Sequence, residues 1–317
     1  MSGDIAAPFS WDLSAPILSP AKRIDDLCFS VKDPSVVYHG GRWHLFCTIR
    51  SKVRSHQIEY LTFDKWGNAN RAARHILRCR DNYFCAPQVF YFRPHRKWYL
   101  VYQIEEPTRR LKLQPAFSTT SNLSDPNSWS PPELFLPNSD PEGIEKWIDF
   151  WVICDEEKAY LFFSSLDGRI WRMWTSLKEF PHGFGHCELA LQADIYEAAH
   201  IYRLSDSNEY LAVIEAQGKG GRRYYKAYTA DRLDGKWRPS ADTEESPFAG
   251  AANVHQPEPA WADSISHGEM IRSGFDETLT VDPHHLQFLI QGVSDEFRTD
   301  RGYGEIPWRL GLLTRRA

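Results

Sequence analysis

The stretch SVKDPSVVYHGGRWHLFCTIR, residues 30–50, contains two apolar runs separated by a Gly-Gly pair. Runs of β-branched and aromatic residues on both sides of a glycine turn predict a β-hairpin. The second run begins with a short phrase, which consists of a polar turn, an aromatic residue and a series of strand formers. A Lys-Asp-Pro turn, residues 32–34, lies near the start of the first run and precedes its apolar part. Asp33 therefore places a carboxylate where a strand is about to begin.

The phrase in the second run recurs along the chain, which indicates a repeated structural unit. Its five copies are HGGRWHLFCTI (39–49), RPHRKWYLVYQ (93–103), DEEKAYLFFSS (155–165), SDSNEYLAVIE (205–215) and DPHHLQFLIQG (282–292). The copies are 56, 61, 50 and 78 residues apart when they are marked by Trp43, Tyr99, Tyr160, Tyr210 and Phe288. A unit of roughly 50–60 residues with about four strands is typical of one blade of a β-propeller.

We therefore predict an all-β fold, a five-bladed β-propeller. It would form a single domain over residues 1–317, with a short irregular N-terminal segment of about residues 1–28. The alternative is a β-sandwich with extra strands, which would place hairpins at a tighter spacing and would not explain the recurring phrase. In a propeller the innermost strands of all blades converge on one axis. Acidic residues at the starts of these strands would meet in one funnel although they lie far apart in sequence.

The composition argues against several classes of partner. The formal net charge is −5 and the charged residues are spread along the chain, so we expect no nucleic-acid partner. No apolar run approaches the roughly 18 residues of a membrane span, so we expect no membrane partner. The start of the chain, MSGDIAAPFSWDLS, lacks the features of a signal peptide, which suggests a soluble protein or a mature form without its leader.

The aromatic and cysteine residues add two further expectations. Aromatic residues make up 14% of the chain, with 12 Trp, and such rings suit stacking on the flat faces of sugars. The six cysteines form no C-x-x-C pair, so the sequence does not indicate a zinc ribbon or a thioredoxin-type site. Cys79 and Cys85 are the closest pair in sequence for a disulfide.

Two more acids lie in apolar, aromatic stretches next to predicted blade strands. They are Asp149 in KWIDFWVICD (146–155) and Glu197 in ADIYEAAHIYRL (193–204). Carboxylates are rarely buried unless they are paired, hydrogen-bonded or used in chemistry. Each acid alone fits a residue that bonds loop amides, but three acids on three blades predict a catalytic set. Glycosidic cleavage needs one acid to protonate the leaving oxygen and one carboxylate to activate water, and a third acid raises the pKa of the proton donor.

Several segments resemble glycoside hydrolase family 62, the α-L-arabinofuranosidases that act on arabinoxylan. They occur in the order of the family and cover nearly the whole chain: KDPSVVYHGGRWHLF, CAPQVFYFRPHRKWYLVYQ, WIDFWVICD, YLFFSSLDGRIWR, LKEFPHGF, ESPFAGAANV, SISHGEMIRSGFDETLTVD and LQFLIQG. The resemblance implies a five-bladed propeller that hydrolyses with inversion. It implies Asp33 as the general base, Glu197 as the general acid and Asp149 as the residue that modulates the pKa of the acid and holds the sugar. An inverting mechanism predicts a base-to-acid separation of about 6.5–9.5 Å.

The resemblance also implies a small arabinose pocket lined by Lys32, Gln88, His267 and Tyr303. The alternative for each is an ordinary structural role, for instance a satisfied strand amide for Gln88. No cofactor is expected for the chemistry, but the family implies a structural calcium ion near the propeller axis with His267 as a ligand. A core histidine is the alternative, because calcium prefers about six to eight oxygen ligands. Glu269, two residues further on, is predicted to be structural.

The chain departs from the family pattern in two places. It has EAAH where the family usually has EASN, so we expect His200 to change the pocket wall or the leaving-group side. The stretches 50–82 and 104–117 are more basic than expected and would rim the funnel where the polysaccharide lies.

The predicted function is release of terminal α-L-arabinofuranose from arabinoxylan or a related polysaccharide. The alternatives are the same mechanism on a different glycan and a propeller that binds glycans without cleaving them. We expect a monomer, and the resemblance implies a secreted or periplasmic protein.

Overall fold

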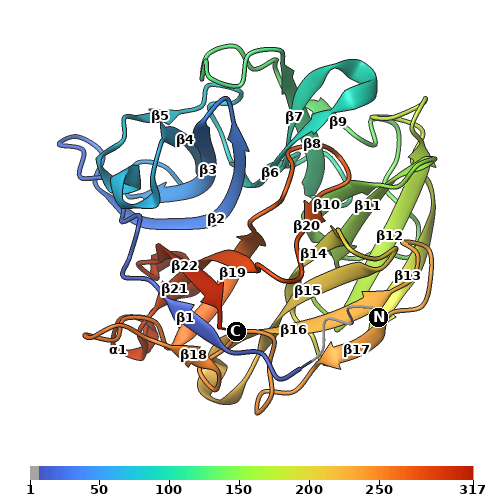
Figure 1. Cartoon of the computed structure of the whole chain (residues 1–317). Coiled ribbons are helices and arrows are strands. Elements are labelled where there is room, and N and C mark those ends of the chain that lie inside the picture. The colour runs from blue at the N-terminus through green and yellow to red at the C-terminus, as the bar shows by residue number, and fades with distance from the viewer. Residues whose placement is uncertain (1–6, 317) are drawn as a thin grey trace.

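The chain forms a ring of five β-sheets around a central axis (Figure 1). The computed structural model describes residues 7–316. Within this part the strands are joined by turns and short 3₁₀ segments, and a single α-helix, α1 (Asp295–Arg298), is present. The predicted all-β, five-bladed propeller is therefore confirmed, and the β-sandwich is excluded.

The strands of the first three blades follow one another along the chain from the axis outwards. The first blade contains β2 (Cys28–His39), β3 (Arg42–Ser51), β4 (Gln57–Phe63) and β5 (Arg74–Ile76). The second contains β6 (Phe84–Phe92), β7 (Lys97–Glu105), β8 (Leu113–Thr120) and β9 (Glu133–Leu134). The third contains β10 (Ile148–Cys154), β11 (Lys158–Ser164), β12 (Arg169–Ser176) and β13 (Gly185–Gln192).

The fourth and fifth blades each include strands from elsewhere in the chain. The fourth contains β14 (Glu197–Leu204), β15 (Tyr210–Gln217), β16 (Arg223–Ala230), β17 (Arg238–Ala241) and the added strand β20 (Thr280–Val281). The fifth contains β19 (Ser264–Met270), β21 (Gln287–Val293), β22 (Arg309–Arg315), β1 (Trp11–Leu13) and β18 (Val254–His255). The recurring phrase of the sequence marks the second strand of every blade, namely β3, β7, β11, β15 and β21.

The two ends of the chain close the ring in the fifth blade. Strand β1 pairs antiparallel with β22, so the first regular strand lies beside the last one (Figure 1). The expected irregular segment of about residues 1–28 thus contributes one short strand; of this segment, residues 1–6 lie outside the described part. Closure of this kind leaves the propeller without a free gap between its first and last blades.

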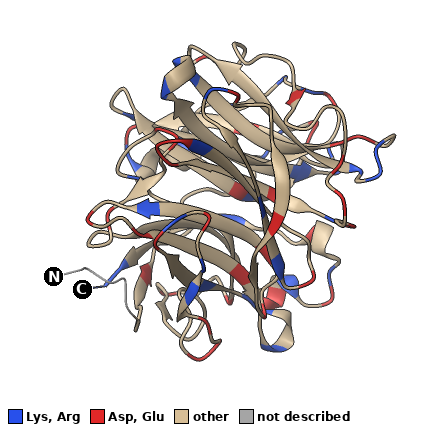
Figure 2. Cartoon of the chain, turned by 90° about the vertical axis from the view of Figure 1, so that its right-hand side faces the viewer, with Lys and Arg blue, Asp and Glu red and all other residues tan. Residues whose placement is uncertain are grey.

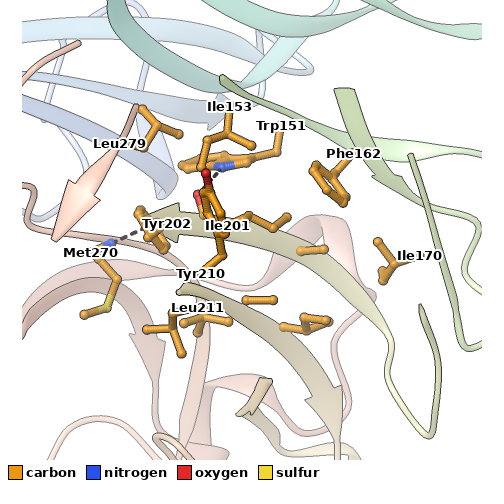
Figure 3. Close-up of a cluster of buried hydrophobic side chains, with 14 of the residues drawn as sticks. Trp151, Ile153, Phe162, Ile170, Ile201, Tyr202, Tyr210, Leu211, Met270 and Leu279 are labelled. Atoms are coloured by element: carbon orange, nitrogen blue, oxygen red, sulfur yellow. Dashed lines mark hydrogen bonds between the residues drawn. The ribbon is translucent and has the colours of Figure 1, made fainter. Parts of the chain in front are cut away.

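The hydrophobic core lies between neighbouring blades, which explains why most strands are apolar on both faces. In Figure 3, Trp151 of β10 packs beside Ile201 and Tyr202 of β14. The indole Nε1 of Trp151 donates to the carbonyl oxygen of Ile201 at 2.9 Å, and the Tyr202 hydroxyl accepts from the backbone N–H of Met270 at 3.0 Å. These contacts join the third, fourth and fifth blades, and they fix the inner strands relative to one another.

The innermost strand of each blade contains a β-bulge at a similar level. Its pairing with the second strand shifts between Lys32 and Ser35, Cys85 and Gln88, Ile148 and Trp151, Glu197 and His200, and Ser266 and Gly268. Four non-glycine residues in these bulges have positive φ, namely Asp33 (48°), Ala86 (53°), Asp149 (56°) and Ala198 (52°). Such conformations cost about 1–3 kcal/mol each and concentrate at functional sites, because bulges redirect side chains.

The segment 275–281 crosses the axis at the ends of the inner strands. The carbonyl oxygens of Phe275, Glu277 and Leu279 accept from the backbone N–H groups near the ends of β6, β10 and β14, at 2.7, 2.9 and 3.4 Å. This segment covers one end of the axis. The bulges lie towards the other end, so a substrate is expected to approach from the side on which the inner strands begin.

Among residues 7–316, no helix has the length and apolar character that a membrane crossing requires. Acidic and basic residues are interspersed over the blades (Figure 2). All six cysteines, which lie in the described part, are free, so the pair Cys79 and Cys85 is not bridged.

Candidate active site

The three predicted acids converge on the axis from three different blades. Asp33 lies in the bulge of β2, Asp149 in that of β10 and Glu197 at the start of β14. His267 of β19 lies between two of them, because its Nδ1 is 3.5 Å from Asp33 Oδ1 and 4.0 Å from Asp149 Oδ2. Asp149 Oδ2 also accepts from the backbone N–H of Ala198 at 3.1 Å, next to Glu197. We define these four side chains as the acid cluster.

Asp33 is paired with the residue that precedes it. Lys32 Nζ lies 3.2 Å from one carboxylate oxygen of Asp33 and 3.1 Å from the other. Neighbouring side chains of a regular strand point to opposite faces, and the bulge allows both to meet here. Burial favours the protonated form of Asp33, which is only 2% exposed, but Lys32 and His267 hold its pKa below its usual value. Asp33 is therefore a carboxylate at neutral pH.

Glu197 has the opposite electrostatic setting. It is 8% exposed, and burial together with the negative charges of Glu215 and Asp149 raises its pKa well above the usual value. Arg223, whose Nη1 lies 3.3 Å from Glu197 Oε1, opposes this shift but does not overcome it. Burial, with a contribution from Asp33, also raises the pKa of Asp149 against the attraction of His267. Two carboxyl groups with opposite pKa shifts in one site are typical of an acid and base pair.

A second buried ion pair supports the acid cluster, and the sequence did not reveal it. Glu215 of β15 accepts from Arg223 Nη1 at 2.7 Å, from Ser266 Oγ at 2.8 Å and from the backbone N–H of His267 at 2.8 Å. Arg223 also lies 4.0 Å from the ring centroid of Tyr196. Glu215 ends the apolar run YLAVIE, so the same signal that marked Asp149 was available for it.

Tyr303 comes from the 3₁₀ segment η4 (Tyr303–Glu305). Among the residues predicted to line the arabinose pocket, it is the exposed one. Its ring centroid lies 5.2 Å from Lys32 Nζ and 5.7 Å from Arg223 Cζ. Because the residue is 44% exposed while the acids beneath it are buried, it presents an aromatic surface beside the acid cluster. This arrangement suits contact with a sugar ring.

The side-chain amide of Gln88 bonds to the neighbouring blade. It is 1% exposed, its Nε2 donates to the carbonyl oxygen of Val152 at 2.7 Å, and its Oε1 accepts from the N–H of Val152 at 2.8 Å. Both polar atoms of the amide are thus used by the neighbouring blade. Gln88 thus ties β6 to β10, and its predicted contact with the sugar stays a prediction.

His200 also lies elsewhere than expected. Its ring stacks on Trp151 at 4.0 Å between centroids, and its Nδ1 donates to the carbonyl oxygen of Gly268 at 2.6 Å. Burial and the neighbouring His267 lower its pKa well below the usual value, so the ring is neutral. Its 5.0 Å edge contact with His267 makes it a support for that residue. The prediction of a pocket-wall or leaving-group position is therefore corrected.

Glu269 is structural, as predicted. It is fully buried and lies 2.7 Å from Arg272 Nη2, which donates to the carbonyl oxygens of Val36 and Val89 at 2.8 Å each. Burial raises the pKa of Glu269 to about 7 despite the nearby guanidinium. Its side chain bonds inner strands of the propeller and takes no part in the contacts of the acid cluster.

Within residues 7–316, no group of three or more His, Cys, Asp or Glu side chains has the geometry of a metal site. The carboxylates nearest to His267 already have partners, since Asp33 pairs with Lys32 and Asp149 accepts from Ala198. Calcium prefers about six to eight oxygen ligands. The residues present therefore do not provide a calcium site by themselves.

Comparisons with known proteins agree with this fold. The model of glycosyl hydrolase family 62 matches residues 21–314. Alpha-L-arabinofuranosidase C of Cellvibrio japonicus (strain Ueda107) is 39% identical over an alignment of 317 positions, which covers 98% of this chain. The chain spans about half the length of that relative, 48%.

Two solved structures resemble the chain over nearly all of its length. An α-L-arabinofuranosidase from Podospora anserina, in complex with cellotriose, is 34% identical with a TM-score of 0.90 and covers 98% of both chains. A family 62 hydrolase in complex with xylotriose is 37% identical with a TM-score of 0.88, over 96% of this chain and 97% of that chain. The resemblance inferred from the sequence motifs is confirmed, and the chain belongs to glycosyl hydrolase family 62.

Proposed function

We propose that the chain is an inverting α-L-arabinofuranosidase that releases terminal arabinofuranose side chains from arabinoxylan or a related polysaccharide. The observation that carries the proposal is the meeting of Asp33, Asp149 and Glu197, from three blades, in one acid cluster. The opposite directions in which the pKa values of Asp33 and Glu197 are shifted support it. The names of the two arabinofuranosidase relatives and the xylotriose and cellotriose complexes support a carbohydrate substrate.

The proposed reaction is a single displacement. Asp33 takes a proton from a water molecule, and the water oxygen attacks the anomeric carbon of the arabinofuranose. Glu197 gives its proton to the glycosidic oxygen as the carbon–oxygen bond breaks, so the polysaccharide leaves as an alcohol. Because attack and departure occur on opposite faces of the sugar, the product has inverted configuration. Asp33 ends protonated and Glu197 ionised, and exchange with solvent restores both.

The neighbouring residues prepare the two acids for these roles. Lys32 keeps Asp33 ionised. Burial, Glu215 and Asp149 together keep Glu197 protonated, and the N–H of Ala198 positions Asp149. Tyr303 is proposed to contact the sugar, and His267 to hold the distance between Asp33 and Asp149.

Replacing Lys32 by Met is expected to move the acid limb of the kcat/KM profile to higher pH. Lys32 lowers the pKa of Asp33, so its loss lets Asp33 take up a proton at a higher pH and lose its function as a base. The check is a pH profile on a soluble aryl arabinofuranoside. The matched control is Lys158→Met, because Lys158 pairs with Asp234 outside the acid cluster. An acid limb that stays in place in Lys32→Met would contradict the pairing.

Replacing Asp149 by Asn is expected to move the basic limb to lower pH and to reduce activity. Asp149 is one of the charges that raise the pKa of Glu197, so its neutralisation lets Glu197 lose its proton earlier as the pH rises. The amide oxygen of Asn can still accept from the N–H of Ala198, which preserves the local geometry. A basic limb at the same pH would remove Asp149 from the modulating role.

The function is tested by incubation with wheat arabinoxylan and analysis of the released sugars. The expected product is free arabinose, with an intact xylan backbone. Parallel reactions with arabinan and arabinogalactan test the alternative of another furanoside. Measurable affinity for these glycans without any released sugar would support the alternative of a non-catalytic binding propeller and contradict the proposal.

Three further properties stay predictions. A calcium ion beside His267 would need water for most of its ligands, and a melting temperature that is higher with calcium than with EDTA would reveal it.

A monomer is expected in light scattering. The resemblance implies secretion or a periplasmic location, which fits a polymeric substrate that cannot enter a cell.

A further inference from the structure

The rim of the first blade carries an arginine-rich pocket outside the acid cluster. It has a volume of about 530 Å³. We define it as the arginine pocket by the five cations that line it, Arg23, Arg54, Arg74, Arg78 and Arg80. Most of them belong to the stretch 50–82, whose basic character the family resemblance does not explain.

The arginine pocket lies on the same side of the propeller as the acid cluster. The start of β2 pairs with the end of β3, since Cys28 faces Ser51, so the loop 52–56 lies on the side where β2 begins. The loop 77–83 leads from β5 into the start of β6 and reaches the same side. Both loops contribute to the pocket through residues such as Arg54 and Arg80.

A short chain of contacts joins the two regions. Gln103 Oε1 accepts from the backbone N–H of Asp149 at 3.3 Å, and Gln103 Nε2 donates to the Tyr83 hydroxyl at 2.9 Å. The ring of Tyr83 lies 4.8 Å from that of His56, which precedes the pocket residue Gln57. These contacts connect the rim that carries the pocket with the acid cluster.

Four of the arginines are oriented by carboxylates behind them. The buried Glu59 pairs with both Arg23 and Arg74. Asp26 holds Arg54 at 2.6 Å, and Glu106 holds Arg80 at 2.8 Å.

Arg78 differs from these four, because it is exposed and no hydrogen bond or ion pair joins it to another described residue. The lining residues also include one acid, Asp81. Asp81 and the three acids Glu59, Asp26 and Glu106 make four carboxylates against five arginines, which leaves an excess of one positive charge. The pocket thus combines fixed guanidinium groups with one unpaired cation.

We propose that the arginine pocket binds the carboxylate of a uronic acid that the polysaccharide carries in addition to its arabinose. Guanidinium groups match carboxylates in geometry and charge, and they bind them through paired hydrogen bonds. The volume lies in the range of pockets that hold small molecules such as one sugar ring. The link to cleavage rests on the proposed function, but binding at the pocket does not.

The direct test is a binding measurement by isothermal titration calorimetry at low salt. The probe is a xylo-oligosaccharide with one glucuronic acid and no arabinose, compared with the same compound after reduction of its carboxyl group. We expect about 10-fold tighter binding of the acidic form, the effect of one charge-assisted hydrogen bond. The variant Arg78→Ala should bind both forms equally. Arg232→Ala is the control, since it removes an exposed arginine beyond the end of β16, away from the pocket.

A kinetic test connects the pocket to turnover. Arabinose release is compared between a xylan that carries both arabinose and uronic acid and its carboxyl-reduced form. The ratio of kcat/KM, acidic over reduced, should exceed 1 in the wild type and fall in Arg78→Ala.

Equal affinity of the wild type for the two oligosaccharides, or a preference that survives in Arg78→Ala, would overturn the proposal. Preferential binding without arabinose release from any polymer would instead contradict the proposed function and leave the pocket supported.

Discussion

Replacing Glu197 by Gln is expected to reduce arabinose release from arabinoxylan by about 10²–10⁴-fold, the usual contribution of a general acid. Gln keeps the volume of the side chain and an oxygen for Arg223, but it has no proton to give to the glycosidic oxygen. The basic limb of the pH profile should also disappear, because that limb reports the ionisation of Glu197, whose pKa is raised.

The leaving group provides the control for this role. A nitrophenolate leaves without much protonation, so the loss in Glu197→Gln should be far smaller on a 4-nitrophenyl arabinofuranoside than on arabinoxylan. Glu305→Gln, an exposed carboxylate in the segment that carries Tyr303, is the matched variant and should behave as the wild type. An equal loss on both substrates would show that Glu197 acts in another way.

Replacing Asp33 by Asn is expected to lower turnover by about 10²–10⁴-fold on every substrate, whatever the leaving group. The base acts on water, and water is needed equally for a sugar and for a nitrophenol as leaving group. The acid limb of the profile should vanish with the carboxylate, because Asp33 loses its function only when it is protonated. The measurement is kcat/KM on arabinoxylan and on the aryl substrate.

Loss of folding is separated from loss of chemistry by a second variant. Asp33→Asn leaves Lys32 buried without an anionic partner, which is destabilising. The double variant Lys32→Met/Asp33→Asn removes both charges and should recover much of the melting temperature while staying inactive. Recovery of activity together with stability would mean that Asp33 supports the fold and is not the base.

The fold was predictable from the sequence because its signals are local. Each copy of the phrase places a turn before an aromatic residue and a strand, and the structure has these residues in the second strand of every blade. The convergence of Asp33, Asp149 and Glu197 was also predictable, because a carboxylate inside an apolar run rarely lacks a use.

The partners of the site residues were less predictable, because local sequence patterns do not contain contacts between blades. An amide such as Gln88 has the same sequence setting whether it faces a sugar or the backbone of the next blade. The bulge between Glu197 and His200 changes the alternation of side chains, so His200 lies beneath the site. The Glu215–Arg223 pair spans a turn and serves residues of another blade.

Inversion requires a water molecule to be activated on the face of the sugar opposite the acid that releases the polymer. Proton NMR during the first minutes of hydrolysis, before the sugar mutarotates, distinguishes the two anomers of free arabinofuranose. A β-anomer that appears first and then equilibrates is the predicted result. An α-anomer that appears first would mean retention of configuration and would contradict the roles assigned to Asp33 and Glu197.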